Sequence, residues 1–270
     1  MNRLRAPLAA AAAICKRDFL LFASYRMRFA TTFVTAAVSL TLFYYVSRLV
    51  RSSTVGNADE YYAFVVVGII ILGVLTSTLA IPVLTLRQEL LAGTFERMVL
   101  SPFGPVRSIL SLLLFPLMLA MASAVASLVF ATLVFDLHLH WSTVPAAVPV
   151  ALLGAIAFAP FGLLMAAAVV LFKQTNAGTT FVVTGITLLA GLYFPVALLP
   201  GWIGWASEAQ PFTPAVDLLR NLLVATPLRD APLLDLAKLV VFPLVMMPVA
   251  LWAVRAAVRR SQRLGTIIEY

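Results

Sequence analysis

Long apolar runs without charged side chains constrain the fold of this chain more than any other feature. Six runs lack Asp, Glu, Lys, Arg and His and come close to the length that crosses a bilayer as a helix. They are residues 29–47, 61–86, 108–135, 147–172, 177–199 and 239–254. They take up most of the 270 residues, of which 62% are hydrophobic and 11% charged. We therefore expect an all-α membrane protein with six transmembrane helices and no soluble catalytic domain.

The charges outside these runs predict how the chain lies across the membrane. Basic residues gather in the N-terminal segment, in the connections after the second and fourth runs, and in the C-terminal tail. Most acidic residues lie in the other three connections. The positive-inside bias then places both termini and residues 87–107 in the cytoplasm. The net charge of +8 follows from this topology and from attraction to anionic lipids, and it gives no reason to propose nucleic-acid binding.

The N-terminal segment is predicted to lie on the membrane surface. Basic and apolar residues are mixed across residues 9–28, just before the first run, which is typical of an interfacial helix. A signal peptide with a lipidated Cys15 is an alternative interpretation. However, the apolar region is short, Ile14 is bulky where cleavage needs a small residue, and Lys16 follows at once, so we expect the segment to be retained. With a single cysteine in the chain, no intrachain disulfide is expected.

The fifth connection, residues 200–235, is predicted to form a re-entrant or interfacial hairpin at the outer face. Trp202 and Trp205 favour the headgroup level of the bilayer. Residues 215–225 have helical apolar spacing but are too short to cross. Asp217 and Arg220 are three residues apart on this helix, so they can pair. An ion pair at the surface contributes little to stability. Its position would still allow it to hold the hairpin together.

The composition of the runs argues against several kinds of chemistry. Proton-coupled carriers need acidic or histidine side chains at membrane depth, and none of the six runs contains one. An intramembrane hydrolase would need a nucleophile beside a base.

Asp136, His138 and His140 would point to one side of an extended segment. No second cluster supports a metal there, so we expect a wet loop and no metal site.

No nucleotide-binding loop is present in the sequence. Such a loop requires a glycine directly before its lysine, whereas the three lysines follow Cys15, Phe172 and Ala237. Any ATP that powers this protein must therefore be hydrolysed by another polypeptide.

The charged segment 87–102, RQELLAGTFERMVLSP, is predicted to be a docking element between the second and third runs. Gly93 can end one helix in the left-handed conformation, and Thr94 can cap a second, short helix over residues 95–100. Glu96 falls in the first turn of that helix, where a carboxylate favours the helix dipole. Ser101-Pro102 ends it. The short helix would display Glu89, Glu96 and Arg97.

These residues resemble the ABC-2 family of ATP-binding-cassette membrane permeases. The resemblance rests on the segment 87–102, on YFPVALLPGW at 193–202, on residues 211–220 ending in DLLR, and on the tail RRSQRLGTIIEY. It covers almost the whole chain and implies one ABC-2 transmembrane domain in a bacterial plasma membrane. It also implies pairing with a second copy or a homologous permease, and docking on a separate ABC ATPase that binds the ATP and Mg²⁺.

The resemblance also implies roles for particular residues. It assigns the coupling to the ATPase to residues of the docking element, namely Arg87, Glu89, Gly93, Thr94, Glu96 and Arg97. It implies that the second and fifth spans line the path for the cargo, where the candidates are Thr76, Thr78, Thr184 and Leu188. No catalytic residue and no cofactor site are expected in this chain.

The cargo expected from the resemblance is lipophilic or amphipathic, such as a drug, an antibiotic, a lipid or a glycolipid. Polysaccharide export by the same family is the alternative. The polysaccharide exporters usually carry an R-Y-K-x-S-x-L-G-like stretch before the first span, and the glycine is missing from KRDFLLFASYRMRF at 16–29. An alternative from another class is a channel or structural membrane protein that needs no ATPase.

Overall fold

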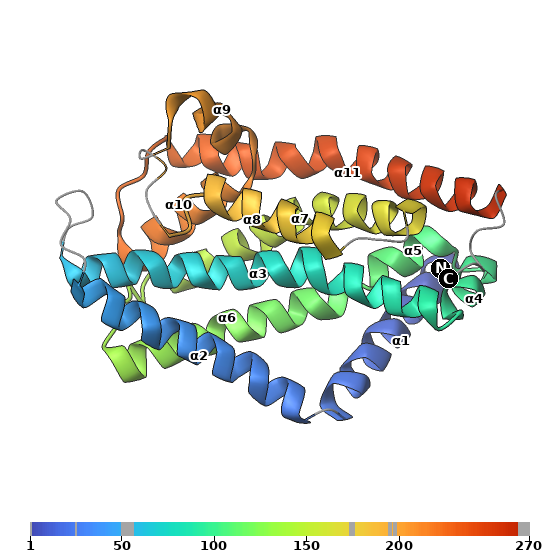
Figure 1. The fold of residues 1–270 in the computed structure, drawn as a ribbon, viewed down its shortest axis with the longest axis horizontal. Helices are drawn as coiled ribbons and strands as arrows, with labels where there is room; N and C mark the ends of the chain where they lie inside the picture. The colour runs from blue at the N-terminus through green and yellow to red at the C-terminus, as the bar shows by residue number, and fades with distance from the viewer. Residues whose placement is uncertain are drawn as a thin grey trace.

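A computed structural model describes residues 2–24, 26–49, 57–172, 176–193, 196 and 199–263. These residues form helices and connections, with no strand among them. The longest helices run side by side, as Figure 1 shows. In chain order the helices are α1 (Asn2–Ser24), α2 (Arg26–Leu49), α3 (Ala58–Leu91), α4 (Thr94–Leu100), α5 (Pro105–Ser111), α6 (Leu114–Phe135), α7 (Val144–Phe172), α8 (Asn176–Leu189), α9 (Gly201–Ala209), α10 (Phe212–Val224) and α11 (Pro232–Arg263).

The helical, membrane-spanning class is confirmed, but fewer spans than six stand out. Within the described residues, four stretches are long and apolar enough to cross a bilayer: α3, α5 with α6, α7, and α11. The apolar parts of α2 and α8, residues 33–49 and 178–189, are shorter. The predicted run 177–199 is not one helix, because α8 ends at Leu189 and Gly191 turns the chain with a φ of 64°.

Two further boundaries differ from the prediction. The run 108–135 is divided between α5 and α6, with a break at Leu112 and Leu113. The predicted interfacial helix 9–28 begins earlier and ends earlier, since α1 covers Asn2–Ser24.

The predicted hairpin 200–235 contains two short helices, α9 and α10, followed by the first turn of α11. Most side chains of α10 are buried, Phe212 and Val216 among them. The ring of Phe212 stacks on Phe158 of α7 with centroids 3.9 Å apart. The helix predicted over 215–225 therefore exists in α10, but it packs inside the bundle against α3, α7 and α11.

The central helix α3 contacts most of the bundle, including α2, α6, α7 and α10. Its backbone comes very close to α7 at Gly162, where an added Cβ would lie 2.7 Å from the Thr78 carbonyl oxygen. With 34 residues, α3 is about 51 Å long at 1.5 Å per residue. A hydrocarbon core measures about 30 Å, so α3 extends well beyond it.

The bundle has two distinct ends. Figure 1 shows α4 at one end, together with the end of α11. We call this the α4 end. The opposite end holds the start of α3, the end of α6 and the chain between α10 and α11.

Candidate functional site

The junction between α3 and α4 has the backbone that the sequence predicts. Gly93 has a φ of 67° and a ψ of 6°, which is the left-handed conformation, and it separates two helices that run in different directions. Glu96 lies in the first turn of α4, as expected, and Ser101 ends the helix in an extended conformation. The result is a seven-residue helix joined to α3 by a very short turn.

Thr94 does not cap α4, which corrects the prediction. Gly93 occupies the cap position, no side chain caps the helix there, and Thr94 is its first residue. The Thr94 hydroxyl instead lies 3.1 Å from the backbone carbonyl oxygen of Glu89, and it also contacts the Glu89 carboxylate. The turn at Gly93 places Thr94 beside the last turn of α3. Its hydroxyl therefore contacts Glu89 and not the backbone amides of α4.

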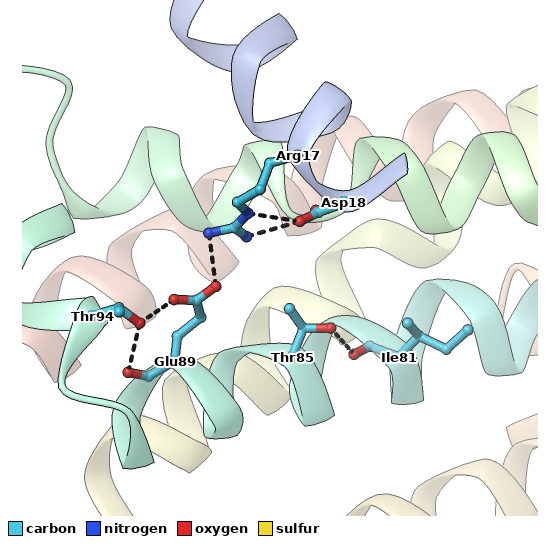
Figure 2. A network of polar contacts seen from close by, with 6 residues as sticks. All are labelled: Arg17, Asp18, Ile81, Thr85, Glu89 and Thr94. Carbon is cyan, nitrogen blue, oxygen red and sulfur yellow. Dashed lines mark hydrogen bonds and ion pairs between the residues drawn. The ribbon is translucent and has the colours of Figure 1, made fainter. Parts of the chain in front are cut away.

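Glu89 connects three helices. Figure 2 shows its carboxylate between Arg17 of α1 and Thr94 of α4. Its Oε1 atom lies 2.8 Å from Nη1 of Arg17, and its side chain is only 13% exposed. The sequence predicted that Glu89 would be displayed toward a partner, but the intrachain contacts cover most of it.

Arg17 is shared between two carboxylates. Its Nη2 and Nε donate to Oδ1 of Asp18 at 2.8 and 3.0 Å, while Nη1 reaches Glu89. Burial raises the pKa of the Asp18 carboxyl, although the neighbouring Arg17 opposes that rise. We call Arg17, Asp18, Glu89 and Thr94 the α1–α4 clamp.

Apolar contacts hold α1 in place beside this clamp. The rings of Phe19 and Phe22 lie 6.4 and 5.6 Å from the ring of Phe115, at the start of α6. Cys15 Sγ lies 3.8 Å from the sulfur of Met118. The predicted N-terminal helix is thus packed against the bundle as well as tied to it by charge.

Phe95, like Arg17 and Asp18, is a residue of this site that the sequence did not predict. It is 1% exposed and belongs to a buried cluster at the α4 end. That cluster also contains Leu90 of α3, Ile109 of α5 and Val254 of α11. A single aromatic residue between Thr94 and Glu96 in a polar segment was the available signal. Phe95 fixes one face of α4, while Arg97 and Leu100 on the same helix are exposed.

The outward side of the α3–α4 junction combines charged and apolar side chains, with Arg87 and Leu91 on the end of α3 and the others on α4. Arg97 is exposed, and Glu96 and Arg87 are partly exposed. Leu91 and Leu100 are 59% and 83% exposed. This mixture, carried by the end of α3 and by α4, is a surface suited to contact with a protein.

The predicted path residues are in different surroundings. Thr184 and Leu188 lie on an exposed face of α8, together with Phe181. Thr76 of α3 is partly exposed, and its hydroxyl donates to the Leu72 carbonyl at 2.9 Å. Thr78 is 2% exposed, beside the close approach of α3 to α7. It therefore does not face an open path in this conformation.

Arg220 does not form the predicted pair with Asp217. Among the described residues no ion pair joins them, and Arg220 is 3% exposed. Its guanidinium donates to three carbonyl oxygens, those of Phe64, Gly191 and Leu192, at 3.2, 3.0 and 2.9 Å. It also stacks 3.3 Å from the Phe64 ring centroid. A buried guanidinium needs such acceptors, so Arg220 ties α10 to α3 and to the turn after α8.

The segment 136–140 forms no helix or strand, and Asp136 begins it in the left-handed conformation with a φ of 50°. Its side chains alternate between exposed and more covered positions. Asp136, His138 and His140 are exposed, while Leu137 is 7% exposed. The backbone N–H of His140 donates to the Leu223 carbonyl at 3.0 Å, which fixes the segment on α10. No group of three or more metal-binding side chains occurs in the part of the chain that the structure describes.

Helices long and apolar enough to span a bilayer, with a short helix fixed at one end of the bundle, define a multi-pass helical membrane protein. A profile of the family described as ABC-2 type transporter matches residues 10–224. The chain belongs to this ABC-2 type transporter family. It is also similar to Nodulation protein J of Rhizobium leguminosarum bv. trifolii, with 31% identity over 93 residues. That alignment covers 34% of this chain and 36% of the relative.

Proposed function

We propose that this chain is the membrane-spanning permease subunit of an ATP-driven exporter, with α4 receiving the motion of a separate ABC ATPase. The observation that carries the proposal is the construction of α4. One face is fixed to the bundle through Phe95, and the other presents Arg97 with Glu96 at its edge. A force on the exposed face is transmitted to α3, α5 and α11 through packed side chains.

The permease works as two paired copies, each with six spans, of which α2 and α8 supply the two shorter ones. The exposed face of α8, with Phe181, Thr184 and Leu188, lines the path where the copies meet, and Thr76 of α3 lies behind it. Both termini are cytoplasmic in this arrangement. The cargo is lipophilic or amphipathic, since the apolar spans offer hydroxyls and no charges. A lipid-linked glycan is the alternative within the same family.

Reconstituted vesicles containing this chain and its ATPase test the coupling role. We expect Glu96→Ala together with Arg97→Ala to preserve insertion and ATP hydrolysis but to lower transport per ATP, because only the exposed face of α4 changes. Glu208→Ala on α9, an exposed acid far from α4, is the matched control. Glu89→Ala with Glu96→Ala is expected to uncouple as well, through loss of the α1–α4 clamp. Normal transport in both double variants, or failure of the chain to co-purify with the ATPase, would contradict the proposal.

A further inference from the structure

The opposite end of the bundle contains a cavity of about 810 Å³. Its walls are formed by the first turns of α3, the segment 135–140, Val196, and α10 with the residues up to Arg229. This volume lies in the range of small-molecule sites, which is about 300–1,000 Å³. The transport mechanism proposed above does not use it.

Charges of both signs line the cavity. Its carboxylates are those of Asp59, Glu60, Asp136 and Asp217, and its guanidinium groups are those of Arg220 and Arg229. The imidazoles of His138 and His140 complete the polar part. An ion of either sign would meet like charges in this wall, whereas a ligand that carries both signs would not.

Several of these groups are already engaged within the chain. Asp59 pairs with Arg48 at 2.9 Å, Glu60 accepts a hydrogen bond from the backbone of Asn57 at 3.2 Å, and Arg220 is occupied by its three carbonyl oxygens. Asp136, Asp217 and Arg229 form no side-chain hydrogen bond or ion pair within the described residues. Two carboxylates and one guanidinium thus remain available to a ligand.

The depth of the cavity matches the boundary between headgroups and hydrocarbon. Asp59 and Glu60 directly precede the apolar run of α3, and Phe64 lies about one turn deeper along the helix. Val196 and Val224 add apolar wall. Trp141 follows the cavity residue His140 and is 65% exposed, and tryptophan favours the membrane interface. A ligand here would place its polar part beside the charges and its apolar part against the hydrocarbon.

We propose that this cavity binds the headgroup of a zwitterionic, amine-bearing phospholipid. Asp217 and Asp136 accept hydrogen bonds from the ammonium group, and Arg229 with the two imidazoles donates to the phosphate. Charge-assisted hydrogen bonds of this kind are the strong ones in proteins. The proposal needs only that the chain spans a bilayer, so it stands apart from the ATP-coupling role of α4.

Native mass spectrometry of the purified, delipidated full chain tests the proposal. The probes are phosphatidylethanolamine, phosphatidylcholine and phosphatidylglycerol with identical acyl chains. We expect phosphatidylethanolamine to bind about tenfold more tightly than phosphatidylglycerol, since one charge-assisted hydrogen bond is worth about that factor. Phosphatidylcholine, whose ammonium has no N–H to donate, is expected in between.

Two variants test the ammonium and the phosphate of the headgroup separately. Asp217→Asn should weaken phosphatidylethanolamine binding but not phosphatidylglycerol binding, because the anionic lipid loses a like charge from the wall, whereas Arg229→Gln, at an exposed position, should weaken both. Asp230→Asn is the control, because Asp230 is at the same end but outside the cavity wall, paired with Lys238. Equal binding of the three lipids, or wild-type binding by both cavity variants, would overturn the proposal. Equally tight binding of free ethanolamine would also overturn it, since the phosphate would then contribute nothing.

Discussion

The carboxylate of Glu89, on the last turn of α3, lies 2.8 Å from the guanidinium of Arg17 on α1. These residues are 72 positions apart in the sequence, and Arg17 holds Asp18 at the same time. The contact makes α1 part of the junction between α3 and α4, so the N-terminal helix packs as a structural partner of α4.

A double-mutant cycle on Arg17→Ala and Glu89→Ala measures this contact. Because Arg17 is 36% exposed, we expect a coupling free energy of only about 1 kcal/mol. Thermal unfolding of the detergent-solubilised protein gives the four stabilities. Additive effects of the two substitutions would show that the ion pair contributes nothing.

Phe95→Ala should destabilise the protein by about 3–5 kcal/mol, as expected for truncating a fully buried phenylalanine. It should also loosen α4 from the bundle, so that ATPase activity persists while transport falls. Phe95→Leu keeps most of the apolar volume and serves as the control, with a smaller loss of stability. Full transport by the Phe95→Ala variant would contradict a role of α4 in transmitting force.

Gly68→Ala should disrupt the junction between α3 and the turn after α8. The added Cβ would lie 2.0 Å from the Leu192 carbonyl oxygen and 3.2 Å from Nη2 of Arg220. Gly73→Ala, on the same helix, meets nothing within 4 Å and should be neutral or stabilising by up to about 1 kcal/mol. The melting temperatures of the two variants are compared. Equal values would contradict the close approach of the α3 backbone to the Leu192 carbonyl.

Arg220→Met should cost more than about 2 kcal/mol, because three carbonyl oxygens lose a charged donor. Arg220→Lys should recover part of that loss, since an ammonium can donate but lacks the planar fork. Protease sensitivity of the connection 190–200 provides a second readout. If Arg220→Met left both the melting temperature and the cleavage pattern unchanged, the three hydrogen bonds would contribute nothing to stability.

Tyr62→Phe should be neutral or slightly stabilising, by about 1 kcal/mol at most. The Tyr62 hydroxyl is buried and has no hydrogen-bond partner in the part of the chain that the structure describes, and an unsatisfied buried hydroxyl is costly. Tyr44→Phe is the contrast, because the Tyr44 hydroxyl accepts a hydrogen bond from Arg48 at 3.1 Å. A clear loss of stability in Tyr62→Phe would reveal a partner for this hydroxyl.

Features set by local chemistry were predicted well from the sequence. The left-handed turn at Gly93 and the position of Glu96 in the first turn of α4 depend on residues within one helical turn, and both are confirmed. The apolar runs likewise predicted the helical, membrane-spanning class. They did not predict the break after α8, because it depends on a turn at Gly191 that apolar composition does not reveal.

Contacts that depend on how the chain turns or packs were predicted poorly. Thr94 was expected to cap its own helix, but it meets the carboxylate of Glu89 once the chain turns. Arg220 was expected to pair with Asp217, three residues away, yet its acceptors are 28, 29 and 156 positions away. In each case the local partner was chemically suitable, and the tertiary fold supplied a better one.

The continuity of α3 has a mechanical consequence. One uninterrupted helix begins with Asp59 and Glu60 in the cavity wall and ends at the turn that carries α4. Pro82 is the one proline inside it, and a proline is where a helix bends most readily. One continuous helix therefore connects the cavity at one end of the bundle with α4 at the other, and Pro82 is the position inside it where a bend is easiest.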